Sequence, residues 1–237
     1  MSRIIYMVFR CFFLAPVWLY HVWRLGRSGD THTEQERYDY LRMIVKRINI
    51  AGRVEVTGYG SENIPEKAGF ILFPNHQGLF DMLALIDTCP KPVGVVIKKE
   101  AANIFLVKQV IALLHGIPID RKDIKSSLET INKMSEEVKA GRNFVIFAEG
   151  TRSKEGNTIL DFKAGTFKSV IKSGCPIVPV ALINSFRPFD IPSIKREKVQ
   201  VHYLEPIYSN QYVGLKTREI AHLVHDEIQK KIDENIG

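Results

Sequence analysis

Short apolar runs alternate with amphipathic segments along residues 53–237. The apolar runs are rich in Val, Ile and Phe, which is typical of buried strands. They are RVEVTG, GFILF, VGVVIK, IPID, NFVIF, PIVPVALI and VQVHYL. Between the runs, apolar residues recur at spacings of three and four, which predicts helices over 81–87, 102–115, 124–140, 162–173 and 217–236. This alternation predicts an α/β fold, with a mainly parallel central sheet flanked by helices.

The first fifty residues follow a different pattern. Residues 4–23 are almost wholly apolar and aromatic, interrupted by Arg10 and His21 and flanked by arginines at both ends. A helix that spans a bilayer needs about 20 apolar residues, and an arginine at its centre costs about 2.5–3.5 kcal/mol. Aromatic side chains favour the head-group layer, so this segment fits a helix in one leaflet as well as one that spans.

Other interpretations of this segment carry less weight. A secretory signal peptide is disfavoured because no A-x-A-like site precedes the polar stretch RSGDTHTEQER. A buried core helix is a further alternative. The following segment, 34–50, has an apolar helical face and either pairs with the first helix or lies on the membrane beside it. We therefore expect an N-terminal membrane-associated helical hairpin over 1–51 and an α/β domain over 52–237.

Composition narrows the class of protein and the kind of partner. Of the 237 residues, 45% are hydrophobic and 25% are charged, as in folded proteins. The three cysteines form no CxxC pair, which argues against a disulfide framework or a zinc site. The net charge of +7 favours anionic partners: nucleic acid, acidic lipid head groups, phosphorylated substrates or an acidic carrier protein. Charge alone does not choose among them.

Polar residues follow three of the predicted strands. PNHQGLFD comes after GFILF, AEGTRS comes after NFVIF, and an Asp-Arg pair ends IPIDR. In a parallel sheet, reactive residues are expected at the carboxyl ends of strands, where loops form a crevice. The sequence therefore predicts that these three loops converge on one site.

His76 and Asp81 give this site its chemistry. If the next helix begins around Gln77 or Gly78, Asp81 lies about one turn beyond His76. Its carboxylate would then accept a hydrogen bond from Nδ1 and leave Nε2 free to act as a general base. Asn75 would position the loop. The alternative is a purely structural pair that caps a helix.

The target of such a base is expected to be a hydroxyl of the substrate, since no serine or cysteine is placed as a nucleophile by a recognisable motif. Cations for a phosphate group are also present. Arg152 suits a bidentate contact, and Glu149 could orient Arg152 or a substrate hydroxyl. The other candidate cations are Arg121, Lys163, Lys98 and Lys99.

Taken in order, these blocks resemble the 1-acylglycerol-3-phosphate acyltransferase (lysophosphatidate acyltransferase) family over roughly residues 55–208. The matching blocks are NHQGLFD, GIPIDR, FAEGTRS and IVPVAL. One departure is Ala148, where the family usually has proline before the glutamate. We expect little effect, because proline would only stiffen the turn.

The resemblance implies transfer of a fatty acyl group from acyl-CoA or acyl carrier protein to the sn-2 hydroxyl of 1-acyl-glycerol-3-phosphate, giving phosphatidic acid. His76, held by Asp81, would be the catalytic base, and backbone N–H groups at the start of the next helix would stabilise the oxyanion. No metal or cofactor beyond the thioester co-substrate is implied. The residues expected to contact substrate are Asn75, Lys99, Arg121, Glu149, Gly150, Thr151, Arg152 and Lys163.

The same resemblance implies a membrane-associated enzyme whose active site faces the cytoplasm, at the inner membrane if the source is bacterial. Its partners would be an anionic lyso-lipid and the thioester donor, with acyl carrier protein attracted by the basic surface. Alternatives are an acyltransferase for another lyso-lipid or for glycerol 3-phosphate, and a non-catalytic membrane-anchored lipid-binding module. Loss of His76 or Asp81 would mark such a module, and both are present. Nucleic-acid binding rests on charge alone.

Overall fold

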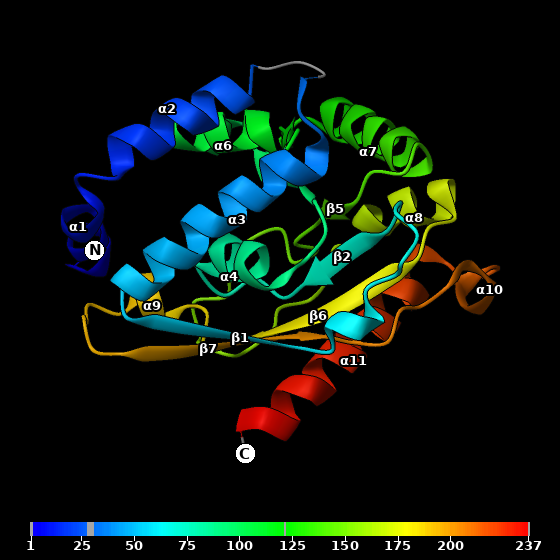
Figure 1. Cartoon of the computed structure of the whole chain (residues 1–237). Helices are drawn as coiled ribbons and strands as arrows, with labels where there is room; N and C mark the ends of the chain where they lie inside the picture. Colours follow the sequence, from blue (N-terminus) through cyan, green and yellow to red (C-terminus); the bar gives the residue numbers. More distant parts are fainter. Residues whose placement is uncertain (1, 28–30, 121, 237) are drawn as a thin grey trace.

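The central element of the fold is a mainly parallel sheet (Figure 1). The structure is a computed structural model that describes residues 2–27, 31–120 and 122–236. Within these residues seven strands pair in the order β1-β7-β6-β2-β5-β3-β4. The strands are β1 (Val54–Tyr59), β2 (Ile71–Pro74), β3 (Gly94–Lys98), β4 (Ile117–Ile119), β5 (Phe144–Val145), β6 (Ile177–Ile183) and β7 (Glu197–Tyr203). Each apolar run named above forms one of them, which confirms the predicted α/β fold.

The strand directions place the candidate loops at one edge of the sheet. β2 runs parallel to β5 and β6, and β3 runs parallel to β4 and β5. β7 is antiparallel to β6 and parallel to β1, so this outer pair ends at the opposite edge. The segments that follow β2, β5, β6, β3 and β4 therefore lie along the same edge, as expected from the sequence.

Helices cover both faces of the sheet. All residues of β2 and β6 are buried as a result, although their side chains alternate between the two faces. One face packs against α3 (Glu34–Ala51), α4 (Asp81–Thr88) and α6 (Phe105–Leu113). The other face packs against α7 (Ile124–Lys139), α8 (Lys168–Ser173) and α11 (Thr217–Ile236). The shorter helical segments are η2 (Ser61–Asn63), α5 (Lys99–Ala102), η3 (Ala164–Phe167), α9 (Arg187–Asp190) and α10 (Ser209–Tyr212).

Helix α3 belongs to the core of the α/β domain. It begins at a capping box formed by Thr33 and Glu36. Its apolar face, which includes Tyr38, Leu41 and Val45, is buried with the side chains of the sheet and of α4. The expected boundary at residue 51 therefore separates elements that the structure packs together. An amphipathic pattern alone does not distinguish a protein face from a membrane face.

The apolar N-terminal segment forms two helices instead of one. α1 (Ser2–Cys11) and α2 (Ala15–Leu25) are bent by 89° at the break between them. Pro16, in the first turn of α2, favours the break because proline clashes with the carbonyl of the preceding turn in a continuous helix. Among the described residues no single helix has the length and hydropathy of a membrane span, whereas the bent pair taken together does.

Large apolar side chains remain exposed on α1, on α2 and on the turn between them. Met7, Cys11, Trp18 and Val22 are buried against the rest of the protein. The outward side chains, here called the N-terminal apolar surface, are Ile5, Val8, Phe9, Phe12, Phe13, Leu14, Val17, Tyr20 and Trp23. Phe9 and Phe13 are 80% and 89% exposed. An exposed patch of this kind is unusual for a protein surface that faces only water.

Candidate active site

The loop after β2 carries the histidine expected from the sequence. β2 ends at Pro74, and α4 begins at Asp81 instead of near Gln77. His76 Nδ1 lies 2.7 Å from Asp81 Oδ2, so the predicted hydrogen bond is present. The His76 ring stacks on Phe147 with 4.1 Å between ring centroids. His76 is therefore held on one side by a carboxylate and on one face by an aromatic ring, and its side chain is 21% exposed.

Asp81 is a buried carboxylate surrounded by donors. Its Oδ2 accepts from the backbone N–H of Gln77 at 2.8 Å, and its Oδ1 accepts from the N–H of Gly78 at 3.0 Å. The hydroxyl of Ser185 lies 2.6 Å from Oδ1. A buried carboxylate needs such donors, and they fix its orientation toward His76.

Two of the backbone N–H groups expected to stabilise the oxyanion are already used by the protein. The N–H groups of Gln77 and Gly78 already donate to Asp81. These two groups therefore orient the dyad instead of facing a substrate.

Gly78 has a steric reason to be glycine. A Cβ added there would lie 2.6 Å from Asp190 Oδ2 and 2.8 Å from Phe186 Cα. The loop after β2 is thus packed directly against the segment that follows β6. The close approach that glycine allows at this position is made by the protein's own chain.

Glu149 holds the loop of His76. Its Oε1 accepts from the backbone N–H of His76 at 2.5 Å, and its Oε2 accepts from the N–H of Leu160 at 3.0 Å. The N–H of Ser153 donates to the carbonyl of His76 at 2.8 Å. Burial raises the pKa of Glu149 to about 7, although both backbone hydrogen bonds oppose the shift. The structure therefore gives Glu149 a positioning contact where a substrate contact was expected.

Asn75 also has a positioning role in the structure. Its side chain is fully buried, and its Nδ2 donates to the carbonyl of Leu182 at 3.0 Å. Its Oδ1 accepts from the N–H of Leu182 at 2.7 Å. These two bonds extend the pairing of β2 with β6 past the last residue of β2. Because both amide atoms are used and covered, the expected substrate contact of Asn75 is not supported.

The predicted cations lie along the same edge of the sheet. Arg152 is partly exposed, and its Nη1 lies 3.4 Å from Asp190 Oδ1. The exposed Lys163 side chain passes next to Gly150, and Thr151 is exposed on the same turn. Lys99 is exposed at the start of α5, beyond β3, whereas Lys98 pairs with Glu100 at 3.4 Å. Arg121 lies outside the described residues.

Residues missed by the sequence reasoning complete the site. Ser185 contacts Asp81 through its hydroxyl, and its N–H donates to Gln77 Oε1 at 3.0 Å. Ser185 follows β6, so the strand-end rule that identified the other loops could also have found it. Asp190, the last residue of α9, pairs with Arg152. No spacing in the sequence indicates that contact.

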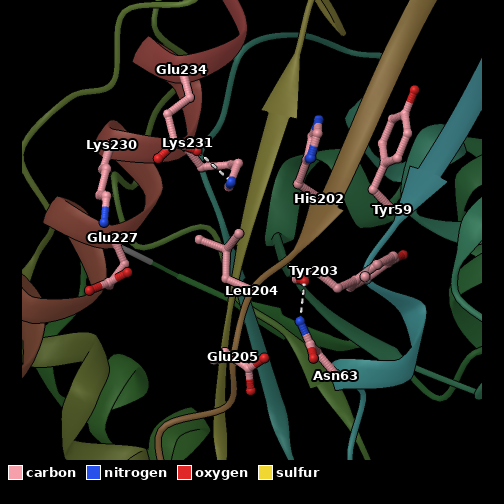
Figure 2. A pocket seen from close by; sticks show the side chains of 11 residues that line it. Tyr59, Asn63, His202, Tyr203, Leu204, Glu205, Glu227, Lys230, Lys231 and Glu234 are labelled. Atoms are coloured by element: carbon pink, nitrogen blue, oxygen red, sulfur yellow. Dashed lines mark hydrogen bonds and ion pairs between the residues drawn. The ribbon is translucent and has the colours of Figure 1, made fainter.

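A cavity of about 370 Å³ lies elsewhere, where β1 and β7 end beside α11. Figure 2 shows its lining, with Tyr59 and His202 on one side, Glu227 and Lys230 of α11 on the other, and Leu204 between them. This is the edge opposite His76. The cavity is therefore separate from the candidate site. Within the described residues, no group of three or more His, Cys, Asp or Glu forms a metal-binding cluster.

The geometry suits proton abstraction from a hydroxyl next to an anionic group. Asp81 holds the proton of the imidazole on Nδ1, which leaves Nε2 with a lone pair. Arg152 supplies a charged donor at the same edge.

Known proteins resemble this chain in both sequence and fold. A family model described as Acyltransferase matches residues 54–183. A 1-acyl-sn-glycerol-3-phosphate acyltransferase from Borreliella burgdorferi is 30% identical, with 76% of this chain and 72% of that protein covered. The enzyme of the same name from Escherichia coli is 31% identical, covering 69% and 67%.

A solved structure extends the likeness to nearly the whole chain. The crystal structure of the 1-acyl-sn-glycerophosphate (LPA) acyltransferase PlsC from Thermotoga maritima superposes with a TM-score of 0.78. The match covers 99% of this chain and 97% of that one at 24% identity. The fold match includes α1 and α2. The sequence matches and the ordered blocks around His76 together show that the chain belongs to the 1-acyl-sn-glycerol-3-phosphate acyltransferase family.

Proposed function

We propose that this protein transfers a fatty acyl group from a thioester to the sn-2 hydroxyl of 1-acyl-glycerol-3-phosphate, giving phosphatidic acid. The observation that carries the proposal is the 2.7 Å contact between His76 and Asp81 at the end of β2, inside the matched family region. The names of the relatives support the choice of acceptor.

In this reaction His76 is the general base. Its Nε2 takes the proton of the sn-2 hydroxyl while the hydroxyl oxygen attacks the thioester carbonyl. The tetrahedral intermediate then breaks its C–S bond, and the leaving thiolate takes the proton back from His76. Asp81 stabilises the imidazolium formed between the two steps, and a correctly placed base contributes about 10²–10⁴-fold in rate.

Arg152 is the described residue best placed to bind the phosphate. It is a partly exposed cation, and it directly precedes Ser153, whose N–H donates to the carbonyl of His76. Lys163, Thr151, Gly150, Lys99 and Arg121 remain further candidates for this site. Arg152 pairs with Asp190 in the structure, so phosphate binding requires it to share or exchange that partner. The thioester itself is the activated donor, either acyl-CoA or acyl carrier protein.

We further propose that α1 and α2 lie in one leaflet with the N-terminal apolar surface facing lipid. The bent helix pair and its exposed aromatic side chains support this geometry. The lyso-lipid acceptor would enter from the leaflet, and the donor would arrive from the cytoplasmic side. The net charge of +7 favours anionic lipid and an acidic carrier protein.

The test compares detergent-purified wild type, His76→Ala and the control His222→Ala. His222 is an exposed histidine of α11, on the face of the sheet that does not pack against α4. Each protein is given a panel of lyso-lipids and glycerol 3-phosphate, with palmitoyl thioesters of coenzyme A and of carrier protein, and the products are identified by mass.

Phosphatidic acid made from lysophosphatidate by wild type and His222→Ala, but not by His76→Ala, is the expected result. Lysophosphatidate binding should survive in His76→Ala, because the base acts in the transition state. Acylation of another acceptor alone would reassign the substrate. If folded wild type forms no acylated product from any acceptor, the proposed activity is wrong and the non-catalytic lipid-binding module is the remaining interpretation.

A further inference from the structure

Arg3 is a fully buried arginine in a helix whose outer face is apolar and exposed. Buried arginines are uncommon, and an uncompensated one is costly. Burial lowers the pKa of Arg3, and the negative charge of Glu197 acts in the opposite direction. The contacts made by this side chain therefore indicate what α1 is fixed to.

The guanidinium of Arg3 joins three separate segments. Nη1 donates to the carbonyl of Gly52 at 2.6 Å, just after α3. Nη2 donates to the carbonyl of Lys195 at 2.6 Å, before β7. Nε donates to the carbonyl of Pro188 at 3.0 Å, inside α9. The planar guanidinium carries five N–H donors in a fixed fork, which lets this one side chain bond three carbonyls at once.

A second ion pair ties the same region to α9. Glu197 is buried, and its Oε1 lies 3.7 Å from Arg3 Nη2. Its Oε2 accepts from Arg187 Nε at 2.7 Å, and Arg187 is the first residue of α9. Arg3 and Glu197 together therefore fix α9 from the side of α1.

The other side of α9 contacts the candidate active site. Asp190, its last residue, lies 3.4 Å from Arg152 Nη1. Phe189 packs edge-on against the buried Phe80, which directly precedes Asp81, with 5.2 Å between ring centroids. Asp190 Oδ2 also limits the space beside Gly78. This one short helix thus touches both the phosphate-binding candidate and the loop of the dyad.

We propose that Arg3 is a positioning residue. It couples the packing position of α1 to the orientation of the Arg152 side chain through α9. The chain of contacts runs from Arg3 to Pro188 and Glu197, then along α9 to Asp190 and Arg152. Release of α1 would let α9 shift and would change where Asp190 holds Arg152. Binding of the acceptor phosphate then depends on whether the first helix is correctly placed. This inference rests on the proposed acceptor.

The experiment uses full-length enzyme in detergent micelles with lysophosphatidate and palmitoyl-CoA. Arg3→Met, of similar length but without donors, is compared with Arg10→Met. Arg10 is an exposed arginine of the same helix, bonded to Tyr6 within α1. We expect Arg3→Met to raise KM for lysophosphatidate about ten-fold while kcat and KM for palmitoyl-CoA change less than about two-fold. Arg10→Met should leave all three unchanged.

Two further variants separate this role from a general loss of structure. Arg3→Lys keeps the charge facing Glu197 and should give an intermediate KM. In an Asp190→Asn background the effect of Arg3→Met should shrink to less than about two-fold, because the coupling passes through Asp190. Independent, multiplicative effects of the two substitutions would overturn the proposal, as would an equal fall in kcat with every substrate.

Hydrogen exchange provides a readout that does not need activity. Arg3→Met should speed amide exchange in residues 184–190 and 149–153 relative to wild type and Arg10→Met. Unchanged exchange in both segments would overturn the coupling. If wild type fails to acylate lysophosphatidate, the proposed acceptor is wrong, and the exchange result decides the coupling alone.

Discussion

Asp81 shows how one buried side chain sets the chemistry of its neighbour. Its carboxylate accepts from His76, from the backbone of the loop that carries His76, and from Ser185 beyond β6. Each donor removes one direction in which the carboxylate could turn. The imidazole consequently presents one orientation and one tautomer to the substrate. Among these donors, the Ser185 hydroxyl comes from a side chain outside the loop of His76, so it can be removed without changing that loop's sequence.

Substitution of Ser185 by alanine tests that orientation. The loss of a hydroxyl donor to a buried carboxylate costs about 1–3 kcal/mol, part of it in the placement of Asp81. We expect Ser185→Ala to lower kcat about ten-fold with little change in KM, measured at saturating thioester. Ser173→Ala is the matched control, since that hydroxyl donates to the carbonyl of Ser169 in α8, which packs against the other face of the sheet. Equal kcat values in the two variants would contradict the role of Ser185.

Glu149 gives the folded protein a pH dependence near neutrality. Burial raises its pKa to about 7 from an ordinary value of 4.5. Between these values the folded protein binds a proton that the unfolded chain has lost. Its contribution to the free energy of unfolding is therefore fully present below 4.5 and is lost as pH rises through about 7.

Glu149→Gln removes this titration while keeping the size of the side chain. The difference in unfolding free energy, wild type minus variant, should fall as pH increases from about 5 to about 7 and stay constant above about 8. Urea denaturation in the same detergent at each pH measures it, because other groups titrate equally in both proteins. A difference that rises with pH, or does not change, would show that Glu149 is ionised throughout.

At the scale of elements, the loop after β2 depends on how closely α9 approaches it. Gly78→Ala would place a methyl group 2.6 Å from Asp190 Oδ2 and 2.8 Å from Phe186 Cα. Because one of these is backbone, the loop or α9 must move. We expect a loss of about 1–3 kcal/mol in unfolding free energy together with a large fall in turnover. Denaturation and steady-state kinetics of the purified variant measure the two effects.

Gly165→Ala is the control for that substitution. A Cβ at Gly165 in η3 meets no atom within 4 Å, and its backbone is not left-handed. Alanine there should be neutral or slightly stabilising, because glycine loses more conformational freedom on folding. Similar losses for both variants would mean that the contact between Gly78 and α9 is not what limits the site.

Regular elements were predictable where the pattern of the sequence is local. Apolar runs such as GFILF and PIVPVALI identify β2 and β6 because a strand buried on both faces is apolar throughout. The start of α4 was not predictable, since the N–H groups of Gln77 and Gly78 turn toward Asp81 instead of continuing a helix.

Long-range contacts set the limit of sequence reasoning at the site. The hydrogen bond between His76 and Asp81 follows from a spacing of five residues. The pairing of Arg152 with Asp190 depends on the path of the chain after β6, which no short motif encodes. Asn75 and Glu149 were assigned to substrate because a motif identifies polar residues but not the direction in which they point.

For the molecule as a whole, the position of α1 relates the candidate site to the proposed membrane-facing surface. α1 lies beside α9 in Figure 1 and contacts it through Arg3, and Asp190 of α9 contacts Arg152, so the first helix lies next to the helix that holds the phosphate-binding candidate. An enzyme that joins a lipid acceptor to a water-soluble donor needs this arrangement. Removal of apolar side chains from α1 and α2 should therefore weaken membrane attachment without disturbing the core.

Phe13→Ser is the sharpest test of that attachment, because Phe13 is 89% exposed and lies between α1 and α2. Burial of a phenylalanine in the interface is worth about 1.5–3 kcal/mol, so the vesicle partition constant should fall at least about ten-fold. Sedimentation with phosphatidylglycerol–phosphatidylethanolamine vesicles measures it. Val213→Ser is the control, since Val213 is 77% exposed but follows α10, away from α1 in Figure 1. Equal binding of both variants would contradict the proposed contact of Phe13 with lipid.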